Sequence, residues 1–141
     1  MMLVKEFISQ SNKNQIISIL LKHYNVGNVK VKTKSMKSHA HFEVETGTLI
    51  ISTKYRKIKS NQIKQFLITI IHEIRHAIDA KKYGWKKFRN MWEWEANKIE
   101  QGHYKGKSDG YWDNPYEIEA EEFGQKNWNK WFNRFKKMKL I

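Results

Sequence analysis

Five consecutive residues, His72-Glu73-Ile74-Arg75-His76, combine the side chains that metal-dependent hydrolysis requires, at a spacing that suits a helix. Positions four apart lie on one helix face about one turn from each other, so both imidazoles can converge on one metal ion. Glu73 then points to the side where a bound water would sit, and its carboxylate can take the water's proton and pass it to the leaving amine. This H-E-x-x-H pattern predicts a metallopeptidase site with His72 and His76 on zinc and Glu73 as general base.

The residues around this motif predict a helix from about residue 61 to 82 that is apolar on much of its surface. Polar side chains in such a setting need partners, because unsatisfied buried polar groups are costly. A metal ion would satisfy both imidazoles and the carboxylate; the alternative is a pair of hydrogen-bonded core histidines with Glu73 paired to a lysine. Asp79, three residues after His76, can accept a hydrogen bond from an imidazole or pair with a lysine at the surface.

A catalytic zinc normally has a third protein ligand, and a chain without cysteine must supply it from His, Asp or Glu. Glu117 and Glu121 are one turn apart on a predicted helix, with Ala120 beside them, and a small residue there lets this helix approach the motif helix closely. Glu117 is then a candidate ligand, and Glu121 a candidate partner for a ligand imidazole. Glu93, in the stretch Glu93-Trp94-Glu95-Ala96-Asn97, is a competing source of the third ligand.

Residues 72–79 and 114–123 together resemble the gluzincin metallopeptidases. The closest resemblance in size is to the minimal, phage- and mobile-element-associated kind related to the ImmA/IrrE family, and SprT-like proteins are a more distant comparison. The resemblance implies a zincin-like fold, Glu117 as the zinc ligand from an E-x-x-A pattern, and hydrolysis of a peptide bond in a specific protein substrate. It also implies that strand 48–53 binds the substrate by edge pairing. The candidates for stabilising the oxyanion are Tyr111, Tyr116 and His103.

Apolar spacing, turn residues and capping residues predict the other elements of an α+β fold with a small antiparallel sheet. His39 and His41 are expected on the solvent face of a strand. The predicted elements are a helix over 13–24, a strand over 29–33, a hairpin of 39–45 and 48–52 around Thr46-Gly47, the motif helix capped by Ser60, a further helical segment that Gly84 separates from the motif helix and that runs to about residue 100, a loop over 102–114, a helix opened by Asn114-Pro115, and a terminal helix over 126–141 that packs on the core.

Composition predicts one domain over residues 1–141 of an intracellular protein. The longest apolar run, residues 66–71, is too short to span a bilayer, so we expect no membrane span. We expect a cytoplasmic monomer. The resemblance implies that the protein is phage-encoded and acts in a bacterial host. The formal charge of +13 is concentrated in residues 1–60, which carry eleven Lys/Arg against three acids. This surplus of positive charge favours binding to nucleic acid or to an acidic protein partner, or else it only keeps the protein in solution. The alternative function is therefore non-catalytic binding of such a partner through the basic surface.

Overall fold

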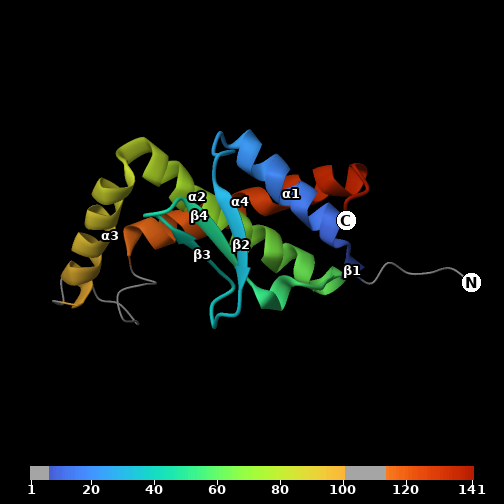
Figure 1. Cartoon of the computed structure of the whole chain (residues 1–141), viewed down its shortest axis with the longest axis horizontal. Helices are drawn as coiled ribbons and strands as arrows, with labels where there is room; N and C mark the ends of the chain where they lie inside the picture. The colour runs from blue at the N-terminus through green and yellow to red at the C-terminus, as the bar shows by residue number, and fades with distance from the viewer. Residues whose placement is uncertain (1–6, 101–113) are drawn as a thin grey trace, which may run out of the picture.

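A computed structural model describes residues 7–100 and 114–141 of the chain (Figure 1). The predicted loop before Asn114, with His103 and Tyr111, lies outside the described residues. The described part mixes helices with short strands, as expected for the α+β class. In chain order its elements are β1 (Phe7–Ile8), α1 (Gln10–His23), β2 (Lys30–Lys34), β3 (Ala40–Glu43), β4 (Thr48–Ser52), β5 (Ile58–Lys59), α2 (Ile63–Tyr83), α3 (Trp85–Glu100) and α4 (Pro115–Lys137), with short 3-10 turns at Thr53–Tyr55 and Ser60–Gln62.

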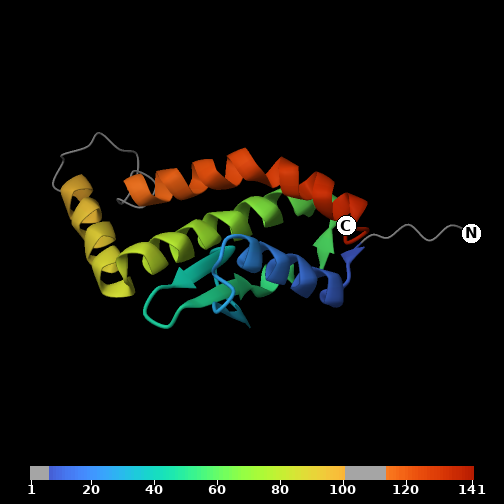
Figure 2. The same cartoon turned by 90° about the horizontal axis from the view of Figure 1, so that it is seen from above.

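Helix α2 carries the motif and lies at the centre of the fold. Figure 2 shows α4 along one side of α2, and α1 with the three-stranded sheet along the other side. The apolar face predicted for this helix is buried, and Phe66, Leu67, Ile70 and Ile71 are each 0% exposed. Burying one such side chain stabilises the fold by about 1.5–3 kcal/mol. Packing on both sides therefore holds the motif helix in place.

Local signals at the helix ends agree with the structure in most places. Ser9 caps α1, Gly84 ends α2 with a positive φ of 85°, and the Asn114 side chain caps α4, with Pro115 in its first turn. The prediction that Ser60 caps the motif helix is wrong, because Ser60–Gln62 forms a 3-10 turn that runs into α2. Such tight turns are common at helix N-termini, and here the turn takes the place of a side-chain cap.

The three-stranded sheet has the strand order β2-β4-β3. The predicted hairpin is present, since β3 and β4 are antiparallel and pair Phe42 with Leu49. The prediction of an antiparallel sheet is wrong for β2, which pairs with β4 in parallel. Helix α1 precedes β2 and the β3 hairpin follows it, so the direction of β2 depends on how these units pack. The alternation of residues within β2 does not indicate whether the strand runs parallel or antiparallel to its neighbour.

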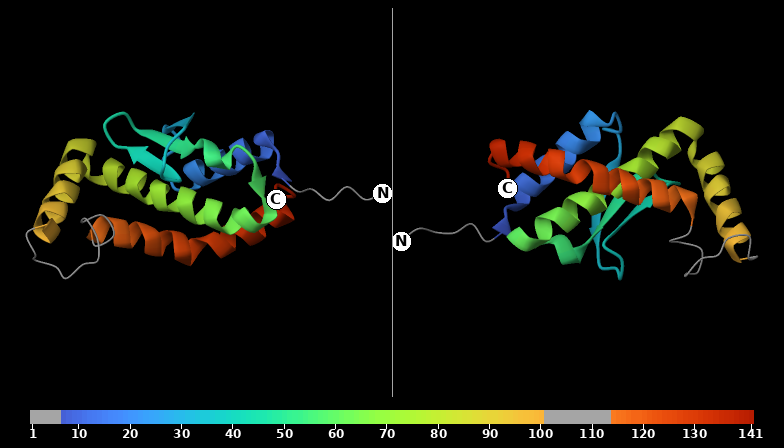
Figure 3. Two further views of the ribbon diagram at one scale, coloured as in Figure 1. Left: turned by 90° about the horizontal axis from the view of Figure 1, so that it is seen from below. Right: turned by 180° about the vertical axis from the view of Figure 1, so that it is seen from behind.

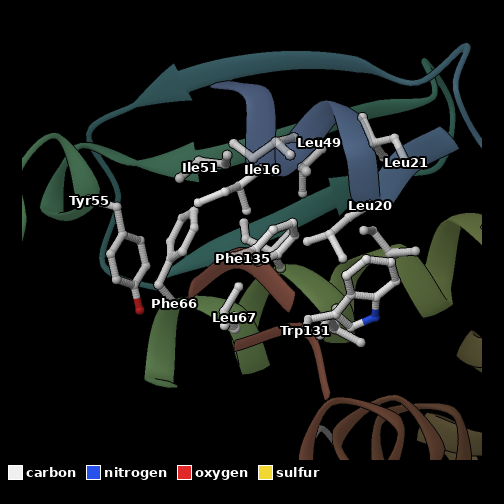
Figure 4. Close-up of a cluster of buried hydrophobic side chains, with 14 of the residues drawn as sticks. Ile16, Leu20, Leu21, Leu49, Ile51, Tyr55, Phe66, Leu67, Trp131 and Phe135 are labelled. Atoms are coloured by element: carbon white, nitrogen blue, oxygen red, sulfur yellow. The ribbon is translucent and has the colours of Figure 1, made fainter. Parts of the chain in front are cut away.

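The C-terminal half of α4 packs on the core, as predicted for the terminal helix. Trp131 and Phe135 are 0% exposed and lie among side chains of α1, β4 and α2 (Figure 4). The structure joins the two predicted C-terminal helices into one, because Pro115–Lys137 is continuous. Ala120 and Gly124 are both buried, one turn apart, on the part of α4 that approaches α2. A Cβ added at Gly124 would lie 2.7 Å from the backbone oxygen of Ile68.

This close approach predicts that Gly124→Ala destabilises the protein. The added methyl group meets a backbone atom inside a helix, which cannot move aside cheaply, and we expect a loss of about 1–3 kcal/mol in the free energy of unfolding. Gly27→Ala is the matched control, because a Cβ there has only an ordinary contact, 3.7 Å from Lys22 Cγ. We expect its effect to lie within about 1 kcal/mol of zero. Urea unfolding of both variants measures the difference, and equal effects would contradict the close approach of α4 to α2.

Two further expectations can be compared with the structure. No helix among residues 7–100 and 114–141 is long and apolar enough to cross a membrane. His41 is exposed on β3, as predicted for the solvent face of a strand, whereas His39 is exposed but lies in the bend just before β3 begins. The His39 ring also has a partner, because its Nδ1 lies 2.8 Å from the Tyr55 hydroxyl.

Candidate metal centre

The two motif histidines lie next to each other on the buried part of α2. His72 and His76 are 5% and 6% exposed, and their ring centroids are 5.1 Å apart. Their Nε2 atoms point to the same place, since each lies within hydrogen-bond distance of one carboxylate oxygen, Glu117 Oε1, at 2.9 Å and 3.0 Å. Three candidate metal-ligand atoms, carried by two helices, therefore meet at one point.

Glu117 reaches this point from the first turn of α4. The cap by Asn114 and the proline after it start the helix at this position, and Figure 3 shows α4 lying alongside α2 with α3 at their end. The second carboxylate oxygen of Glu117 accepts a hydrogen bond from Trp92 Nε1 at 2.7 Å. Burial alone would raise the pKa of Glu117, but the hydrogen bonds from His72 and His76 outweigh it and hold this pKa well below its usual range. Glu117 is thus a buried, charged carboxylate between two imidazoles.

His72 contacts a second carboxylate through its other ring nitrogen, with Nδ1 lying 3.2 Å from Glu121 Oε1. Both carboxylate contacts of this ring need a donated proton. Burial lowers the pKa of His72, but the contacts with Glu117, the charge of Glu73 and the hydrogen bond to Glu121 outweigh it and raise the pKa to about 9. A metal ion at Nε2 would take the place of one proton and leave Nδ1–H to donate to Glu121, which is the usual arrangement around a ligand histidine.

Glu73 lies beside the histidines and is 5% exposed. Burial raises the pKa of Glu73 to about 7, against the opposing charges of His76 and His72 and a hydrogen bond from the backbone of Phe42. The ligand atoms of His72, Glu73 and His76 lie within 4.8 Å of one another, so this buried cluster could hold a metal ion. The donor atoms are imidazole nitrogens and carboxylate oxygens, which suit a borderline divalent cation.

A cleft of about 440 Å³ opens onto this cluster. One wall is β3 with the turn that follows it, from His41 to Glu45, and the other wall is α3, through Phe88, Arg89, Trp92 and Glu93. The motif residues Glu73 and His76, with Glu117, also line it. A ligand in the cleft can therefore reach the general-base candidate Glu73 together with two of the candidate metal ligands, His76 and Glu117.

The structure places the other candidate residues in different surroundings. Glu93 is exposed on α3 and pairs with Arg89, its Oε1 lying 3.1 Å from Arg89 Nε, so it lines the cleft without meeting the imidazoles. Asp79 lies 3.4 Å from Arg75 Nε through Oδ1, and neither its Oδ2 nor His76 Nδ1 has a hydrogen-bond partner among the described residues. The expected contact between Asp79 and an imidazole is therefore absent among the hydrogen bonds of the described residues. The ring of Tyr116 packs edge-on against Phe88.

Two contributions to the site were missed by sequence reasoning. Trp92 orients the Glu117 carboxylate, and the backbone of Phe42 in β3 contacts Glu73. Neither has a sequence signal, because a tryptophan on an amphipathic helix resembles a core residue and every residue type except proline can supply a backbone N–H.

The expectation that strand 48–53 binds a peptide by its edge is wrong. Strand β4 is the middle strand of the sheet and pairs with β2 on one side and β3 on the other. The edge nearest the site belongs to β3, whose residues line the cleft. The strand immediately before a motif helix in sequence need not be the edge strand in space, since strand order follows the packing of the whole sheet.

Comparison with known proteins found no relative, so the function is inferred from the geometry of the site. No family model matches the sequence, and neither a curated protein nor a solved structure matches it.

Proposed function

We propose that this protein is a zinc-dependent peptidase that hydrolyses a peptide bond in a protein substrate. The observation that carries the proposal is the meeting of His72 Nε2 and His76 Nε2 at Glu117 Oε1, beside the buried Glu73 and under an open cleft. Two imidazoles and one carboxylate are a ligand set of catalytic zinc, which keeps a further position open. The resemblance of residues 72–79 and 114–123 to gluzincins supports the same function.

The observed distances fit such a metal centre. Zinc binds these ligands at about 2.0–2.1 Å, which separates neighbouring tetrahedral ligands by roughly 3.3 Å. Glu117 Oε1 lies 2.9 Å and 3.0 Å from the two imidazole nitrogens, so both of these ligand pairs are already close to the separation that zinc would require. Bound zinc would lower the pKa of a water molecule and polarise the substrate carbonyl.

The chain's own residues divide the remaining tasks. Glu73 takes a proton from the attacking water and delivers it to the leaving amine. Glu121 holds the His72 ring in one orientation, and Trp92 does the same for the Glu117 carboxylate. The edge of β3 offers backbone groups to an extended peptide lying in the cleft between β3 and α3.

Metal removal tests this function. We expect the zinc-loaded protein to cleave members of a peptide library of mixed sequence, because the cleft is open and the nucleophile is generated at the metal. Treatment with a chelator should abolish cleavage and lower the melting temperature, since a bound ion stabilises only the folded state. Added zinc should restore both, as measured by mass spectrometry and calorimetry.

Two outcomes would contradict the proposal in different ways. Zinc that leaves the melting temperature unchanged would show that the cluster holds no metal. Zinc that raises the melting temperature without any cleavage of the library or of full-length proteins would point to a non-catalytic protein with a structural ion.

A further inference from the structure

Strand β2 carries a line of lysines on the face of the sheet that points away from the core. All five residues of Lys30–Lys34 are exposed. The parallel register places Val31 and Thr33 beside Leu49 and Ile51, which are 1% and 2% exposed. Side chains alternate between the two faces of a strand, so the lysines at alternate positions, Lys30, Lys32 and Lys34, lie on the opposite face from this core.

Two more exposed lysines, Lys37 and Lys54, follow shortly after the ends of β2 and β4. Lys34 pairs with Ser52 of β4, and the Ser52 hydroxyl accepts a hydrogen bond from the backbone N–H of Lys54 at 3.2 Å. The Lys54 ammonium in turn donates to the backbone oxygen of Lys37. We call the set of Lys30, Lys32, Lys34, Lys37 and Lys54 the lysine row. Each member is exposed.

The lysine row is not neutralised by neighbouring acids. None of its members takes part in an ion pair among residues 7–100 and 114–141. The sequence has no Asp or Glu at all between residues 7 and 42 or between residues 46 and 72. On this face the register places Glu43 of β3 two strands across from Lys30, and Glu43 accepts a hydrogen bond from the Thr46 hydroxyl. The row therefore creates a local positive field.

Acids are instead collected around the metal centre. Glu43 of β3 and Glu45 of the following turn line the cleft, as does Glu93 of α3. Figure 1 shows β2 on the side of the sheet away from α3, so the lysine row and the cleft occupy different parts of the surface. The two surfaces suit different partners.

We propose that the lysine row binds the phosphate backbone of nucleic acid without reading its sequence. Alternate residues of a strand are about 6.6–6.8 Å apart, so the three members on β2, Lys30, Lys32 and Lys34, present regularly spaced point charges to a linear polyanion. Lysine neutralises phosphates and releases their counterions, which supplies sequence-independent affinity. The row has no arginine, asparagine or aromatic member, and these are the side chains that read or stack on bases. The inference does not depend on the metal centre.

The test is a binding measurement on the full-length protein by fluorescence anisotropy, with a labelled DNA of mixed sequence as single strand and as duplex. We expect binding of both that weakens steeply with salt, with a slope in log–log form of about −0.9 per neutralised phosphate on duplex. The triple variant Lys30→Gln/Lys32→Gln/Lys34→Gln should bind at least about tenfold more weakly and show a smaller slope, by about 0.9 for each lost contact. Replacing the same three lysines by arginine should preserve binding.

The matched control is Lys126→Gln/Lys137→Gln/Lys139→Gln, which removes the same charge from exposed positions on and just after α4. We expect this variant to keep most of its affinity, and circular dichroism should show that both triple variants are folded. Equal losses in the two triple variants would reduce the effect to net charge and overturn the proposal. An unchanged affinity in the β2 variant, or no binding to either DNA at low salt, would also overturn it. Binding to anionic lipid vesicles that is lost in the β2 variant while DNA binding is kept would assign the row to membranes instead.

Discussion

Glu117→Gln is expected to abolish zinc binding, whereas Glu93→Gln is expected to leave it intact. Both residues belong to E-x-x-A stretches, but only Glu117 Oε1 lies within hydrogen-bond distance of the two motif imidazoles, at 2.9 Å and 3.0 Å. Glutamine keeps the size of the side chain and can still accept the hydrogen bond from Trp92. The Glu117→Gln change therefore removes the negative charge of the candidate metal ligand and keeps the size of its side chain.

The expected loss of affinity can be given a lower bound. Mutating a group that only supports a ligand typically weakens metal binding 10–100-fold, so removing the ligand charge itself should cost more than about 100-fold. Glu93 is half exposed and pairs with Arg89, also at the surface, so its change should have little effect on metal binding or stability. Zinc titration followed by calorimetry measures both variants against the unaltered protein. A Glu93→Gln protein that loses zinc while Glu117→Gln keeps it would exclude the proposed ligand set.

Glu73→Gln is expected to remove peptide hydrolysis while zinc remains bound. The Glu73 carboxylate is buried next to both imidazoles and lines the cleft, where it can reach a water on the metal. General acid–base catalysis by a positioned side chain typically contributes a factor of about 10²–10⁴ to the rate. Glutamine is nearly isosteric but cannot accept the proton, so we expect a decrease in turnover of this order. The measurement is the rate of cleavage of any library peptide that the unaltered, zinc-loaded protein cuts.

Glu45→Gln is the control for this change, because Glu45 lines the same cleft but lies at its exposed mouth, paired with Arg89. We expect this control to change turnover much less than Glu73→Gln does. Zinc content and melting temperature should be close to those of the unaltered protein in both variants. If Glu73→Gln cleaves peptides at the normal rate, the carboxylate is not the general base, and a role in stabilising the buried imidazoles would remain.

The sequence by itself determined the features that depend on neighbouring residues. The four-residue spacing placed His72 and His76 on one helix face, and the same rule placed Glu117 and Glu121 one turn apart. Apolar spacing located the helices, and Gly84 and Asn114 marked two of their boundaries because a left-handed turn and a side-chain cap are local requirements. The hairpin of β3 and β4 followed from alternation on either side of a glycine turn.

The tertiary structure alone decided how distant segments meet. It brought Glu117 to the imidazoles and left Glu93 at the cleft wall, because the approach of α4 to α2 depends on Gly124 fitting against the Ile68 backbone. It placed β4 between two strands and turned β2 parallel to it, against expectation. It also paired Asp79 with Arg75. Local patterns state which face of an element is apolar, but the partner of that face is set by packing over the whole chain, and no short stretch of sequence contains it.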